Sequence, residues 1–125
     1  MEHNNIKTWA ECAPRLVAVA AGRMHADLVI RKGRWVNVHT REILPDHDIA
    51  IVEGRIAYVG EDASHCTGPT TEIIDAEGRF MIPGLCDAHM HIESGMLTPA
   101  EFARAVIPHG TTSMFTDPHE IANVL

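Results

Sequence analysis

Short runs of aliphatic and β-branched residues, separated by turn signals, fill the middle of the chain. The runs are Leu28–Ile30, Trp35–Val38, Asp48–Val52, Arg55–Val59, Thr71–Ile74 and Arg79–Ile82. The pairs between them are Lys32-Gly33, Glu53-Gly54, Gly68-Pro69 and Glu77-Gly78. Such runs predict strands, and Glu53-Gly54 predicts a hairpin turn. The pattern therefore predicts an antiparallel meander over about residues 26–82.

One short helix is predicted before these strands. Thr8 and Glu11 have the spacing of a capping box. Pro14 would remove a backbone hydrogen bond from a helix that begins there, so a start at Pro14 is the alternative. Gly22 is suited to the C-terminal cap. Residues 1–25 are thus expected to form an N-terminal helical segment.

The pattern changes after Pro83-Gly84. The run Leu85–Ile92 predicts a strand, and Thr111–Thr116 predicts another. Between them, Thr98-Pro99 followed by Glu101 has the signature of a helix start with a closed capping box. A strand, a helix and a strand in this order form the unit of a parallel sheet. We therefore expect an α/β fold from residue 84 onward.

Composition narrows the functional classes. The formal net charge is −7, which argues against binding to a nucleic-acid backbone. Three widely spaced cysteines indicate neither a disulfide framework nor a cysteine zinc site. The polar N-terminus lacks the features of a signal peptide and no apolar run could span a bilayer, so no membrane partner and a cytoplasmic location are expected. The 9 histidines, almost as many as the 10 Lys and Arg, point to metal or proton chemistry.

The densest group of candidate ligands lies on the strand predicted over Leu85–Ile92. Side chains alternate along a strand, so Asp87, His89, His91 and Glu93 are expected on one face. Two imidazoles two residues apart can share one ion. A solvated edge strand is the alternative interpretation. Parallel strands of this kind are normally buried on both faces, and buried polar side chains are costly without partners. A bound metal would supply the partners, so the metal interpretation is favoured.

A second polar group follows the strand predicted over Thr111–Thr116. It comprises Asp117, His119 and Glu120. The carboxyl ends of parallel strands carry ligand sites in α/β folds, so the two groups are expected to meet. Asp117 is also suited to cap a helix beginning at Pro118, and both roles stay open.

These motifs resemble a known family. The segment Pro83-Gly84 through Asp87, His89 and His91 is similar to the entry motif of the amidohydrolase superfamily. Its continuation over residues 91–103, 108–112 and 117–124 resembles the bacterial adenine deaminases within that superfamily, with Gly95 where a second Ser is expected. The resemblance implies the N-terminal part of a metal-dependent (β/α)₈ barrel, preceded by a small antiparallel β-sandwich. Residues 26–83 would belong to the sandwich and residues 84–125 to the start of the barrel.

The resemblance also implies an activity and a site. Members of the family convert adenine to hypoxanthine and ammonia by metal-dependent hydrolysis, in purine salvage. His89 and His91 correspond to metal ligands, whereas Glu93, Asp117, His119 and Glu120 correspond to residues near the site. The expected metal is manganese or iron, or zinc in some members, in a binuclear centre. The full-length form is expected to be a homo-oligomer.

Chain length conflicts with a complete enzyme. A (β/α)₈ barrel needs about 250 residues, and those after Ile82 suffice for two strands and one helix. We therefore expect an N-terminal fragment that is inactive alone. Two alternatives remain: an enzyme assembled with a complementary chain, and a β-rich metal-binding module without activity.

Overall fold

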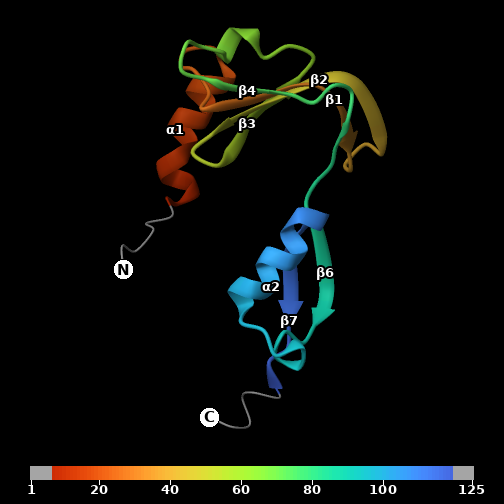
Figure 1. The fold of residues 1–125 in the computed structure, drawn as a ribbon. Helices are drawn as coiled ribbons and strands as arrows, with labels where there is room; N and C mark the ends of the chain where they lie inside the picture. Colours follow the sequence, from red (N-terminus) through yellow and green to blue (C-terminus); the bar gives the residue numbers. More distant parts are fainter. Residues whose placement is uncertain (1–6, 120–125) are drawn as a thin grey trace. The chain divides into compact units, whose positions relative to one another are not determined.

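Two units make up the chain, and residues 7–119 are described by the computed structural model (Figure 1). The first unit extends to Ile82 and the second begins at Pro83. The elements of the first are α1 (Trp9–Ala20), β1 (Leu28–Asn37), β2 (Glu42–Val52), β3 (Arg55–Gly60), η1 (Ser64–Cys66), β4 (Glu72–Asp75) and β5 (Phe80–Met81). Those of the second are β6 (Leu85–Met90), η2 (Glu93–Gly95), α2 (Pro99–Val106), η3 (Ile107–His109) and β7 (Thr111–Thr116). Within residues 7–119, no helix is long and apolar enough to cross a membrane.

The capping box at Thr8 determines where α1 begins. The Thr8 side chain accepts a hydrogen bond from the Glu11 backbone, and the Glu11 carboxylate accepts one from the Thr8 backbone. This reciprocal pair satisfies two helix-end donors, so the helix starts ahead of Pro14 and contains it. The alternative start at Pro14 is therefore wrong.

The first sheet is mixed, with the order β3-β2-β1-β4 and with β5 also paired to β1. The hairpins β1–β2 and β2–β3 are antiparallel, as predicted, and Glu53 and Gly54 both have positive φ in the predicted turn. The prediction of an antiparallel meander is wrong for β4 and β5, which run parallel to β1. Because β2 covers one edge of β1, the other edge is open to later strands. Residues 61–71 return the chain to that open edge at the end where β1 starts, so β4 runs along β1 in the same direction.

Lys32-Gly33 forms a bulge inside β1 rather than the turn expected from sequence. The register with β2 shifts on both sides of Gly33, and Lys32 has a φ of 54°. The buried Asp48 carboxylate accepts the backbone N–H of Lys32 and that of Ala63, each at 3.0 Å. A Cβ at Gly33 would overlap the side chain of Met81, so glycine allows β5 to approach β1.

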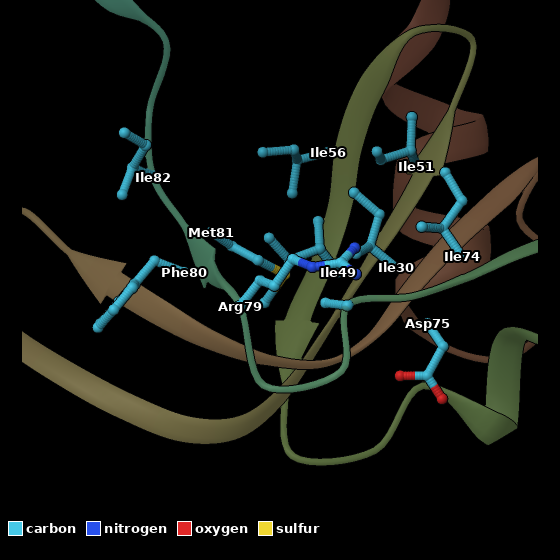
Figure 2. Close-up of a pocket in the computed structure, with 11 residues that line it drawn as sticks. Ile30, Ile49, Ile51, Ile56, Ile74, Asp75, Arg79, Phe80, Met81 and Ile82 are labelled. Carbon is cyan, nitrogen blue, oxygen red and sulfur yellow. The ribbon is translucent and has the colours of Figure 1, made fainter. Parts of the chain in front are cut away.

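One face of the first sheet packs against α1 and η1, and the other lines an open apolar hollow. Val29, Ala50 and Val52 are buried with Val19 of α1 and with the η1 segment, in the core of this unit. The alternate residues point to the opposite face, where Figure 2 shows isoleucine side chains from β1 to β4. They line an apolar hollow of about 460 Å³ together with Phe80 and Met81. Ile56 on this face is 60% exposed.

The second unit has the predicted strand, helix and strand, with β6 and β7 parallel. Thr98 caps α2 and Pro99 is at its first position, as expected. The capping box is not closed, because the Glu101 carboxylate binds Arg104 at 2.7 Å instead. Gly110 ends the following turn with a φ of 96° and leads directly into β7.

Candidate metal centre

The first histidine pair lies where β6 ends. His89 is inside the strand, whose last residue is Met90, and His91 follows it. The predicted strand over Leu85–Ile92 is therefore too long by two residues. Ile92 adopts a helical backbone (φ −64°, ψ −39°), which turns the chain into η2. Strand alternation consequently does not place Glu93, contrary to the prediction that all four polar residues share a strand face.

The rings of His89 and His91 converge. Their Nε2 atoms lie 2.9 Å apart, with ring centroids at 4.6 Å. The Asp87 carboxylate points back to the backbone and accepts the N–H of His89 at 3.1 Å. Asp87 thus stabilises the end of the strand.

The backbone of Asp117 orients the His91 ring. Nδ1 of His91 lies 2.7 Å from the Asp117 carbonyl oxygen, which can only accept a hydrogen bond. The ring therefore carries its hydrogen on Nδ1, which leaves the lone pair of the neutral ring on Nε2. That nitrogen is the one that meets His89.

Asp117 and His119 join this cluster from the end of β7. The Asp117 carboxylate lies 2.9 Å from Nδ1 of His119, and the rings of His91 and His119 are 4.8 Å apart. The hydrogen bond with His119 lowers the pKa of Asp117 below its ordinary value, and the nearby imidazoles lower it further. Ligand atoms of His91, Asp117 and His119 all lie within 4.8 Å of one another.

The donor atoms fit a divalent cation. Imidazole nitrogens with a carboxylate suit zinc, iron and manganese, and two converging Nε2 atoms can bind one ion. The structure thus brings together His89, His91, Asp117 and His119 of the predicted site. Glu93 lies beside the same ring, with Oε1 3.8 Å from Nδ1 of His91. Glu120 lies outside the described residues.

One partner of the site was missed by sequence reasoning. The acceptor for His91 is the backbone carbonyl of Asp117. Every residue type has such a carbonyl. No side-chain pattern signals such a contact. Only the predicted proximity of the two strand ends pointed to it.

Comparisons with known proteins show what the chain is similar to. Residues 80–125 match the sequence model of the amidohydrolase family. The chain is 76% identical over all 125 residues to an adenine deaminase from Ruegeria pomeroyi, and 60% identical over 116 residues to one from Moorella thermoacetica. The chain is therefore similar to adenine deaminases, as the sequence motifs indicated. The chain spans about a fifth of these curated relatives, 21% and 19% of their lengths.

Solved structures support the same fold. A molinate hydrolase superposes on 74% of the chain with a TM-score of 0.59 at 21% identity, over 24% of its own length. A prolidase complexed with N-methylphosphonate-L-proline superposes on 71% with a TM-score of 0.57 at 21% identity, over 25% of its length. These likenesses show a shared fold for the aligned part and say nothing of the substrate.

Proposed function

We propose that this chain is the N-terminal segment of a metal-dependent adenine deaminase, which hydrolyses adenine to hypoxanthine and ammonia. The observation that carries the proposal is the convergence of the His89 and His91 Nε2 atoms beside Asp117 and His119. It lies in a chain whose relatives at 60 to 76% identity are adenine deaminases. The relatives supply the substrate, and the cluster supplies a place for the metal.

The second unit corresponds in this proposal to the first strand, helix and second strand of a (β/α)₈ barrel. Residues 84–125 begin the barrel, residues 26–83 contribute to a β-sandwich and residues 1–25 form the helical segment that precedes it. The sandwich would place its second layer on the isoleucine face of the first sheet, whose hollow is apolar. Burying such a face is favourable by about 25 cal/mol per Å² of apolar surface.

The chain's own residues divide the chemical work. His89 and His91 would hold a divalent ion, which when bound lowers the pKa of water and binds it close to the substrate. The Asp117 carboxylate fixes the His119 ring through a 2.9 Å contact, and this pair is placed to hold or pass a proton. The net reaction consumes adenine and water and releases hypoxanthine and ammonia. Glu93 and Glu120 are assigned only to the vicinity of the site.

The ion we propose is manganese or iron, with zinc as the alternative, in a binuclear centre completed by residues outside this chain. Imidazole and carboxylate donors accept all three metals, so geometry and availability decide among them. We place the enzyme in the cytoplasm as a homo-oligomer without nucleic-acid or membrane partners. Sedimentation of the full-length protein would test the oligomer directly.

The test joins these 125 residues to the remainder of the Ruegeria pomeroyi adenine deaminase, in place of the matched segment. The resulting full-length enzyme is loaded with Mn²⁺, and hypoxanthine is measured by chromatography alongside released ammonia. We expect adenine turnover by the joined enzyme and none by the 125-residue chain. Turnover by the short chain would contradict its assignment as an inactive segment, and an inactive joined enzyme that binds metal would contradict the activity.

A second hypothesis is an assembly module that works only with a complementary chain. It is favoured by the exposed apolar residues on the two strands of the second unit, Leu85 (50% exposed) and Phe115 (69%). Supplying the remainder of the Ruegeria enzyme as a separate chain would restore turnover on mixing under this hypothesis. Under the first hypothesis, adenine turnover would return only when the two parts are joined covalently.

A further inference from the structure

The carboxylate of Glu93 is buried beside the metal centre without a hydrogen bond to Oε1 among the described residues. The side chain is 5% exposed. With Ile92, Leu97 and Pro99 it lines a small, mostly apolar cavity of about 130 Å³. Burying a carboxylate in such surroundings is costly unless a positive or donating group compensates it.

The imidazole of His91 lies beside this carboxylate and would compensate its charge once Nε2 binds a cation, because the ring then gains positive charge. Oε1 of Glu93 lies 3.8 Å from Nδ1, the nitrogen that also donates to the Asp117 carbonyl at 2.7 Å. Two oxygen acceptors therefore lie on the Nδ1 side of the ring. Nε2 is on the other side, 2.9 Å from Nε2 of His89.

The helical backbone of Ile92 produces this arrangement. A strand that continued through residue 93 would place successive side chains on alternating faces and separate residues 91 and 93 by two strand steps. The turn into η2 instead returns the Glu93 side chain toward the Nδ1 side of His91. The buried carboxylate is thus held next to the Nδ1 edge of the His91 ring.

We infer that Glu93 is a positioning residue that acts through His91, keeping the ring hydrogen on Nδ1 and strengthening Nε2 as a metal ligand. The inference rests on the proposed function, because it requires His91 to hold the ion. A negative charge beside the ring favours the positive charge that the imidazole acquires when Nε2 binds a cation. Partners of this kind typically change metal affinity by about 10- to 100-fold.

The test is Glu93→Gln in the joined full-length enzyme, with metal affinity as the readout. Dissociation constants for Mn²⁺ and Co²⁺ are measured by competition with a chelator, and the visible spectrum of the Co²⁺ form is recorded. We expect binding weaker by about 10- to 100-fold and a changed Co²⁺ spectrum. The matched control is Glu101→Gln, which removes the same charge from an exposed pair in the same unit and should leave both readouts unchanged.

An unchanged dissociation constant and spectrum in Glu93→Gln would overturn the inference. If this variant does not fold, Glu93→Asp keeps the charge and draws it back from His91 by one methylene. Weaker metal binding by the Asp variant supports the inference, and wild-type affinity overturns it. Failure of the proposed function gives a different result: the unsubstituted joined enzyme would bind metal without converting adenine. The ratio of the metal dissociation constants of Glu93→Gln and the unsubstituted enzyme would still test the inference.

Discussion

The two units differ in where their buried surface lies. Among residues 7–119, every buried apolar side chain except Ile92 belongs to the first unit, in which α1 packs on the sheet. The second unit exposes apolar residues from both strands and holds the histidine cluster. The buried core and the candidate metal ligands therefore lie in different parts of the chain. A unit that binds ligand with little core of its own depends on neighbours for rigidity.

Charges follow the same division. In the first unit, Lys7 and Arg15 both bind the Glu53 carboxylate, at 2.6 and 3.0 Å, and Arg15 also binds Asp27. The Arg15–Glu53 pair links α1 to the β2–β3 hairpin. In the second unit, Glu101 pairs with Arg104, whereas the carboxylates of Glu93 and Asp117 lie beside imidazoles. The ion pairs of the first unit stabilise its fold. In the second unit, the Nε2 atoms of His89 and His91 converge.

The largest expected effect separates chemistry from stability. Replacing His89 and His91 together by Ala in the joined enzyme should abolish metal binding and adenine turnover, because both proposed nitrogen ligands are lost. In the 125-residue chain carrying the same substitutions, unfolding followed by tryptophan fluorescence should not change, since its two tryptophans, Trp9 and Trp35, belong to the first unit. Metal content is measured by atomic emission. His109→Ala removes an exposed histidine as the control, and full metal retention in the double variant would refute the ligand assignment.

The converse experiment weakens the first unit alone. Val29→Ala removes two methyl groups from a fully buried site in the core and should lower the free energy of unfolding by about 2 kcal/mol. Urea unfolding of the 125-residue chain, monitored by tryptophan fluorescence, measures the change. Val17→Ala, at a position on α1 that is 58% exposed, should shift the midpoint little. Equal losses in the two variants would show that the core is not where the structure places it.

Acid should act on the first unit through Glu53. Hydrogen bonds from Lys7 and then Arg15 lower the pKa of Glu53 to about 2 from its ordinary 4.5. The unfolded state then binds more protons between these values, so this contribution to stability is complete above about pH 4.5 and is lost as the pH falls toward 2. Glu53→Gln should flatten the fall of the urea midpoint over that interval. Glu77→Gln, from an exposed pair with Arg79, should leave the fall intact, and an identical profile for both variants would contradict the assignment.

The smallest effect compares the two helix caps. Thr8→Ala and Thr98→Ala each remove a side-chain acceptor and should cost about 1 kcal/mol. The loss at Thr8 should be the larger, because its box is reciprocal, whereas Glu101 binds Arg104. Exchange rates of the Glu11 and Glu101 backbone amides report each cap separately. Faster exchange at Glu101 than at Glu11, relative to wild type, would reverse the predicted order.

Local signals predicted the local structure well. The capping residues Thr8 and Thr98 and the hairpin turn at Glu53-Gly54 were visible in sequence, because each depends on neighbouring residues. The parallel pair β6–β7 was visible through the order strand, helix, strand. The parallel pairing of β4 with β1 was not, because it joins residues more than forty positions apart through a free strand edge. Nothing in the composition of residues 72–75 distinguishes a parallel from an antiparallel partner.

The candidate site shows the same limit at finer scale. The H-x-H spacing placed His89 and His91 together, and the strand order brought Asp117 beside them. The position of Glu93 could not be predicted, because it follows from a single change of backbone at Ile92. The backbone acceptor for His91 lies 26 residues away and is independent of side-chain type.

The pairing of β1 has a consequence for the order of events during synthesis. One edge of β1 can pair with β2 as soon as residue 52 has left the ribosome, but its other edge waits for β4 and β5, which end at Met81. Until then that edge offers unpaired N–H and C=O groups to any other nascent strand. The completion of the first sheet therefore coincides with the emergence of Pro83 and Gly84. The segment that bears His89 and His91 therefore emerges from the ribosome only after the strands that complete the preceding sheet.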